Sequence, residues 1–177
     1  MKNNSIGKFI CLILRHKPNS IGISLDENGW ANTQEQLNGV NTAGNKIRME
    51  QLIHIVDTDN KHRFSFNSDK SKIRANQGHS IPVNLGLLEL VPPTILYHGT
   101  SEKFIESIKQ NGIQKRSRQY VHLSSNIETA VAVGKRHGNP IVLKINTEQM
   151  FLDGYKFYLS ENGVWLTDNV PYQYVLS

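Results

Sequence analysis

Two consecutive prolines, Pro92 and Pro93, separate two halves of the chain that have different sequence patterns. Proline has no backbone N–H and disfavours a helical conformation in the residue before it, so this pair predicts an extended connector. The stretch before it, from residue 76, contains the polar run Gln77-Gly78-His79-Ser80 and no clean apolar periodicity. At 177 residues the chain is long enough for two small lobes. We therefore expect an α+β protein with lobes at residues 1–90 and 91–177.

The first half carries helical patterns that are followed by a strand pair. Apolar spacing, a capping-box pattern and a stretch of alternating residues mark the elements. The predicted helices are residues 5–17, a short helix from Thr33, and 49–57; the predicted strands are 61–66 and 73–75. Three helices and a hairpin is the order of a winged helix, although many small α+β domains share it.

The second half contains two similar junctions, each with a short strand, a histidine, a hydroxyl residue and a helix. The first is Leu96-Tyr97-His98-Gly99-Thr100, and the second runs from Tyr120 to Ser125 through His122 and Ser124. A strand that ends at a helix N-terminus presents free N–H groups that suit an anion. One such junction is most simply an ordinary connection, but two in one half-chain favour a binding site.

The rest of the second half alternates short helical and strand patterns. The predicted helices are 102–110 and 126–137, the latter opened by Ser125 and Glu128; the predicted strands are 141–145, 155–159, 164–166 and 172–176. Glu161-Asn162-Gly163 is a typical hairpin turn between two of these strands.

Several classes of protein are excluded by composition and motif. Hydrophobic residues make up 38% and charged residues 20% of the chain, which is typical of a globular protein. The single cysteine, Cys11, cannot form an internal disulfide, and no apolar run is long enough to span a bilayer. With no signal-peptide pattern at the N-terminus, we expect a cytoplasmic protein without membrane contact. The seven histidines show no ligand spacing, so no metal site is expected.

Arginine is the residue type that points to chemistry. Arg15 and His16 lie at the end of the first predicted helix, Arg63 lies within a strand pattern, and Arg118 precedes the His122 strand. Each alone is most simply a solvated surface residue. Together, near junctions suited to anions, they indicate phosphate, because a guanidinium matches two phosphate oxygens at once. The net charge of +5 permits a polyanionic partner.

Five runs of residues, in order along the chain, resemble one known family, the RNA 2′-phosphotransferases of the KptA type. They are Ile13-Leu14-Arg15-His16-Lys17, Lys61-His62-Arg63-Phe64, Ile73-Arg74-Ala75-Asn76-Gln77-Gly78-His79-Ser80, His98-Gly99-Thr100, and Ser117-Arg118-Gln119-Tyr120-Val121-His122-Leu123-Ser124. The resemblance implies a winged-helix N-terminal lobe that binds RNA. It also implies a C-terminal mixed-sheet lobe similar to ADP-ribosyltransferases, which binds NAD as co-substrate.

The same resemblance implies a reaction linked to tRNA splicing. An internal RNA 2′-phosphate passes to NAD, giving 2′-hydroxyl RNA, nicotinamide and ADP-ribose 1″,2″-cyclic phosphate, with no metal and no protein partner. The family's catalytic set maps onto Arg15, His16, Arg63 and Arg118; its NAD-binding elements map onto His98, Gly99, Thr100, His122 and Ser124. His62 stands where the family often has Gln, and Tyr120 where it often has His.

The chemistry agrees with this set of residues. A phosphate dianion is already an ionised nucleophile, so a site without a catalytic carboxylate is understandable, and arginines would neutralise the phosphoryl oxygens. Two other functions remain open. One is an ADP-ribosyltransferase acting on nucleic-acid ends or protein, and the other is a winged-helix regulator that binds nucleic acid.

Overall fold

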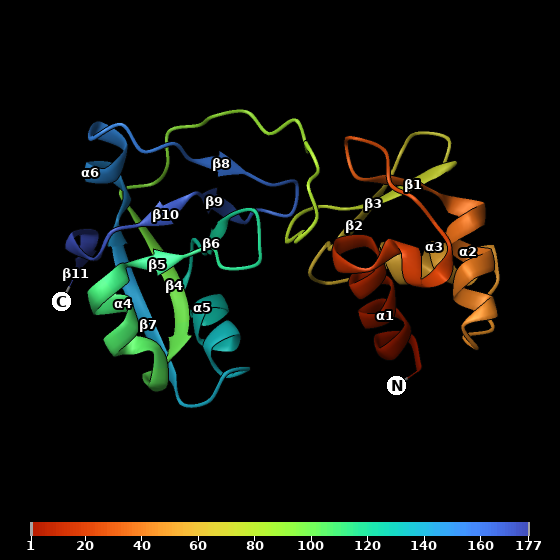
Figure 1. Cartoon of the computed structure of the whole chain (residues 1–177), viewed down its shortest axis with the longest axis horizontal. Helices are drawn as coiled ribbons and strands as arrows, with labels where there is room; N and C mark the ends of the chain where they lie inside the picture. Colours follow the sequence, from red (N-terminus) through yellow and green to blue (C-terminus); the bar gives the residue numbers. More distant parts are fainter. Residues whose placement is uncertain (1, 177) are drawn as a thin grey trace. The chain divides into compact units, whose positions relative to one another are not determined.

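The computed structural model describes residues 2–176 and separates them into two compact units, one ending at Gly86 and the other beginning at Leu87 (Figure 1). Each unit has its own apolar core, and each combines helices with β-sheet, which confirms the α+β class. None of the helices described is both long enough and apolar enough to cross a bilayer.

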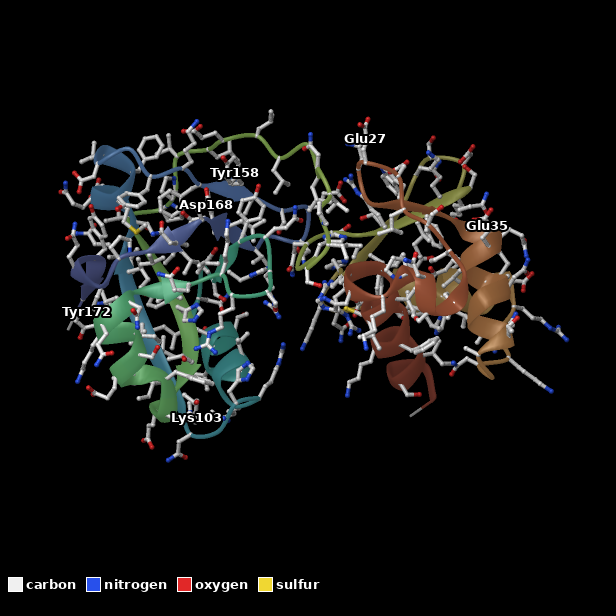
Figure 2. All side chains as sticks on the ribbon, viewed as in Figure 1. Glu27, Glu35, Lys103, Tyr158, Asp168 and Tyr172 are labelled. Carbon is white, nitrogen blue, oxygen red and sulfur yellow. The ribbon has the colours of Figure 1, made fainter. Side chains whose placement is uncertain are left out.

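The first unit packs three helices on a small antiparallel sheet. Its helices are α1 (Lys2–His16), α2 (Thr33–Thr42) and α3 (Met49–Asp57), with a 3₁₀ turn, η1 (Pro18–Ile21). Its strands are β1 (Trp30–Asn32), β2 (Phe64–Phe66) and β3 (Lys72–Ala75), in the order β1-β3-β2. Ile10, Ile13 and Leu14 of α1 are fully buried, as i, i+3, i+4 spacing predicts. The carboxylates of Glu27 and Glu35 point outward (Figure 2).

Two boundaries in this unit differ from the prediction. The N-cap of α2 is Asn32, whose Oδ1 accepts hydrogen bonds from the backbone N–H groups of Gln34 and Glu35, at 2.9 and 3.0 Å. Thr33 is therefore the first helical residue rather than the cap. Strand β2 begins only at Phe64, because His62 has a positive φ of 42° and belongs to a turn.

The described part of the second unit contains three small antiparallel sheets and three short helices. Its strands are β4 (Ile95–Ser101), β5 (Ile113–Gln114), β6 (Val121–Leu123), β7 (Pro140–Asn146), β8 (Tyr158–Leu159), β9 (Trp165–Thr167), β10 (Asn169–Val170) and β11 (Val175–Leu176). They pair as β11-β7-β4, β6-β9-β8 and β10-β5. Its helices are α4 (Ile105–Asn111), α5 (Ile127–Gly134) and α6 (Thr147–Leu152), with 3₁₀ turns η2 (Glu102–Phe104) and η3 (Tyr172–Tyr174).

The first predicted junction is built differently from the expectation. His98, Gly99 and Thr100 lie inside β4 and pair with β7 residues Leu143, Val142 and Ile141. The strand therefore continues through the motif, and the backbone there belongs to a ladder instead of a helix N-terminus. The second junction is closer to its prediction, but Asn126, not Ser125, caps α5 by accepting a hydrogen bond from the N–H of Thr129 at 2.8 Å.

Other elements of this unit were missed or misassigned. Helix α6 and the β5–β10 pair were not predicted, and residues 172–174 form a 3₁₀ turn ahead of a two-residue strand. Every strand pair in the described chain is antiparallel, so a mixed sheet with parallel pairs is not found there. The reason is visible at β4 and β7: α5 returns the chain to the end of β4, where Ser101 pairs with Pro140, so β7 runs back along it.

Candidate functional site

Arg63 is held by a carboxylate that lies just beyond α3. The guanidinium Nη2 of Arg63 donates to Oδ1 of Asp59 at 2.7 Å, and Nε donates to both oxygens at 3.0 and 3.1 Å. The backbone N–H of Arg63 also donates to Oδ2, at 2.7 Å. Burial opposes ionisation of Asp59, but the hydrogen bonds from Arg63 outweigh it and leave the pKa of Asp59 below its ordinary value.

The same guanidinium lies against one side of α1. A Cβ added to Gly7 would sit 3.6 Å from Nη2 of Arg63, and the thiol of Cys11 is close enough to affect the pKa of Arg63. Gly7, Cys11 and Arg15 are four residues apart in sequence, so they share that side of the helix. The structure therefore brings the predicted residues Arg63 and Arg15 to one side of α1.

His16 and Arg15 are tied to the segment that follows β3. Nδ1 of His16 lies 2.9 Å from the hydroxyl of Ser80, and the N–H of Ser80 donates to the carbonyl of Arg15 at 3.0 Å. A Cβ on Gly78, whose φ is +88°, would sit 3.4 Å from the Arg15 guanidinium. Residues 78–80 therefore pack against the predicted catalytic pair at the end of α1.

His79 lies in the middle of this arrangement and is only 1% exposed. Burial, reinforced by the charges of Arg15, His16 and Arg74, lowers the pKa of His79 to about 4. The ring is therefore neutral at pH 7, and it adds no further positive charge beside the arginines.

The lowered pKa of His79 predicts that the free energy of unfolding of the first unit depends on pH. The unfolded chain takes up a proton near pH 6.5, whereas the folded chain resists until about pH 4. Above pH 6.5 neither state is protonated at this residue, so His79 does not reduce the free energy of unfolding there. As the pH falls from 6.5 to 4, only the unfolded chain gains the proton, and the free energy of unfolding decreases by roughly 3 kcal/mol. Denaturant titrations at pH 7 and 4.5 should show a smaller fall for His79→Gln than for the wild type. An equal fall in both would contradict a neutral buried His79.

In the second unit the predicted residues Arg118, His122 and His98 form one chain of contacts. Nη1 of Arg118 lies 3.4 Å from Nδ1 of His122, and Nδ1 of His98 lies 3.1 Å from the His122 carbonyl. An arginine only donates and a carbonyl only accepts, so Nδ1 of His122 accepts and Nδ1 of His98 carries a proton. Burial, together with the charges of Arg118 and His137, lowers the pKa of His98 despite that hydrogen bond. His98 is therefore neutral at pH 7, with Nε2 as an acceptor.

The remaining predicted binding residues have clear structural roles. A Cβ on Gly99 would overlap the carbonyl oxygen of Ala130, so glycine here allows α5 to approach β4. Thr100 is 5% exposed inside β4, and the backbone of Ser124 exchanges hydrogen bonds with Tyr97, joining β6 to β4. These contacts place His98 beside His122. Whether Gly99, Thr100 and Ser124 also bind a ligand stays a prediction.

The next question is whether the described residues could hold a metal ion. Within the described residues, no group of three or more His, Cys, Asp or Glu side chains is arranged to hold a metal ion. The predicted catalytic residues in each unit are cationic or neutral, and guanidinium groups suit an anion.

Comparison with known proteins decides the family. The model of the RNA 2′-phosphotransferase, Tpt1 / KptA family matches residues 1–169. The chain belongs to this family. A probable RNA 2′-phosphotransferase of Fusobacterium nucleatum is 59% identical over 171 residues, covering 96% of each chain. Those of Flavobacterium johnsoniae and Acaryochloris marina are 53% and 48% identical, covering 97% and 96% of this chain and 94% of each relative.

His62 and Tyr120, the two residues that differ from the family's usual ones, each have a defined structural environment. His62 occupies the positive-φ turn before β2, and its carbonyl accepts a hydrogen bond from Asn76 at 2.7 Å. Tyr120 packs its ring on Tyr158, with the centroids 5.6 Å apart (Figure 2 labels Tyr158). Neither residue is among the four predicted catalytic positions.

Sequence reasoning assigned no role to Asp59, His79 or Ser80, which contact or surround those positions. A signal for Asp59 existed, because an acid four residues before an arginine is a typical ion-pair spacing. His79 and Ser80 lie in one of the five family-like runs, but no local pattern shows that Ser80 meets His16 across 64 residues of chain.

Proposed function

We propose that this protein removes an internal 2′-phosphate from RNA by transferring it to NAD. The products are 2′-hydroxyl RNA, nicotinamide and ADP-ribose 1″,2″-cyclic phosphate. The observation that carries the proposal is the family match over residues 1–169, which includes all four residues to which catalysis was assigned. They are Arg15, His16, Arg63 and Arg118.

The architecture of the two units supports assigning RNA binding to one and NAD binding to the other. Helices α1 to α3 followed by the β2–β3 hairpin support a winged-helix interpretation of the first unit. The β4–β7 ladder joined to β6 through Tyr97 and Ser124 supports an ADP-ribosyltransferase-like interpretation of the second. In this scheme the first unit binds RNA and the second binds NAD.

The cationic side chains supply the phosphate chemistry. Arg63 is fixed on one side by Asp59, and Arg15 and His16 lie along the same helix, so their donors would bind and orient phosphoryl oxygens. No general base is required, since a 2′-phosphate monoester is largely dianionic near pH 7. The main work of these residues is to neutralise charge that builds on phosphorus oxygens during transfer.

Residues of the second unit fit NAD by the chemistry of their donors and acceptors. Nε2 of the neutral His98 accepts hydrogen bonds, which suits a ribose hydroxyl, and the exposed Arg118 suits a phosphate. NAD would supply the ribose carbon that accepts the phosphate, with nicotinamide as the leaving group.

The deciding experiment is to incubate the whole chain with NAD and an RNA oligonucleotide that carries one internal 2′-phosphate. We expect one nicotinamide released for each 2′-phosphate lost, and none with the same RNA bearing a 2′-hydroxyl. Equal release with both RNAs would indicate an NAD hydrolase or a different acceptor. Binding of NAD and RNA without any release would instead favour the regulator interpretation.

A further inference from the structure

We infer that Asp59 is a positioning residue for Arg63: its carboxylate fixes the guanidinium along α1 so that Nη1 is presented to a phosphate oxygen of the substrate. The inference rests on the proposed function, because it gives Asp59 a purpose only if Arg63 binds the transferred phosphate.

The hydrogen bonds divide the donors of Arg63 into two sets. The carboxylate of Asp59 accepts hydrogen bonds from the backbone N–H, Nε and Nη2 of Arg63, at distances between 2.7 and 3.1 Å. Among the side chains that the structure describes, which begin at Ser5, none hydrogen-bonds to Nη1, and the Arg63 side chain keeps 20% of its surface exposed. One edge of the guanidinium is therefore committed to Asp59, while the Nη1 side remains available to a ligand.

The second constraint on the guanidinium comes from α1. Nη2 of Arg63 lies 3.6 Å from the place a Gly7 Cβ would take, which is ordinary van der Waals distance. The group is thus held by a carboxylate on one edge and lies beside α1, with room there for no more than a small side chain at Gly7. An arginine side chain otherwise has considerable rotamer freedom, and fixing it before the substrate arrives lowers the entropy lost on binding.

The surroundings of Asp59 suit a role in positioning Arg63 better than a role in the electrostatic attraction of RNA. Its side chain is 5% exposed, and it follows α3 in a turn in which the N–H of His62 donates to the Asp59 carbonyl at 2.7 Å. A carboxylate also reduces the net positive charge of a phosphate site, so it cannot be there to draw RNA in. Its useful effect is geometric, and removal should lower kcat without raising KM for RNA.

The test measures 2′-phosphate transfer by the full chain carrying Asp59→Asn, with Asp57→Asn as the matched control. Asp57 ends α3 two residues earlier and is exposed. We expect Asp59→Asn to lower kcat roughly 10- to 100-fold, the effect of a misplacement of about 1 Å, with KM for RNA unchanged or lower. Asp57→Asn should match the wild type. Circular dichroism would normalise each rate to folded protein.

A double-mutant comparison separates positioning from a merely structural role. In an Arg63→Ala background, Asp59→Asn should cause no further loss of activity and should raise the melting temperature, because it removes a buried carboxylate that lacks its partner. An equal loss of activity in both backgrounds would overturn the inference, as would an Asp59→Asn variant as active as the control. A wild type that releases no nicotinamide with the 2′-phosphorylated RNA would overturn the proposed function, and this inference with it.

Discussion

Replacing Arg63 or Arg118 by alanine should lower kcat/KM for 2′-phosphate transfer about 100- to 1000-fold. This is the size of the loss when one preorganised donor to a developing oxyanion is removed. Arg63 is already oriented by Asp59, and Arg118 contacts His122 in the second unit. The proposed function therefore predicts that each acts through a guanidinium in a defined position, and not only through its positive charge.

Arg48 and Arg116 are the matched controls for this prediction. Both are exposed; Arg48 precedes α3, and Arg116 stacks over Phe104 with its guanidinium carbon 4.9 Å from the ring centroid. Neither belongs to a family motif, so alanine should leave the rate nearly unchanged. Comparable losses at all four positions would show that bulk positive charge is what matters.

A second substitution at Arg63 is needed, because alanine leaves the Asp59 carboxylate buried without a partner. Breaking such a pair destabilises a protein by about 3–5 kcal/mol. Arg63→Lys retains the charge but loses the planar fork, so it should keep the fold while remaining strongly impaired. A melting temperature near that of the wild type together with a low rate would assign the loss to chemistry rather than unfolding.

Gly99→Ala should unfold or severely destabilise the second unit, by about 3 kcal/mol or more. The added methyl would overlap the Ala130 carbonyl, which is backbone and cannot rotate aside. Either α5 moves away from β4 or the β4–β7 ladder distorts, and both changes disturb His98 next to it in sequence. Thermal melting followed by circular dichroism would measure the loss.

Gly7→Ala is the control for that substitution. Gly7 lies in α1, and a Cβ there would meet its neighbours only at ordinary van der Waals distances. Alanine also favours helix over glycine by about 1 kcal/mol, so this variant should melt at or above the wild-type temperature. If Gly99→Ala melted like Gly7→Ala, the close approach of α5 to β4 would be disproved.

The residues proposed to bind phosphate can be selected without the fold, but their arrangement cannot. Arg15, Arg63 and Arg118 could be selected because each lies in a motif, whereas nothing local shows that Arg63 rests against Gly7 or that His16 meets Ser80. Such contacts join residues tens of positions apart, and the local patterns of a single sequence carry no information about them. Asp59 is the intermediate case, because its spacing from Arg63 is local but its burial is not.

The sequence alone determined the elements whose signals are local. Helix α3 has the predicted bounds, Met49–Asp57, and the β8–β9 hairpin forms around Glu161-Asn162-Gly163, because apolar spacing and turn residues act between near neighbours. Tertiary structure decided the path of His98, Gly99 and Thr100. Their local pattern resembles a strand end, but pairing with β7, some forty residues away, carries β4 through to Ser101. Backbone groups left unpaired in a buried position are costly, so the available ladder outweighed the local signal.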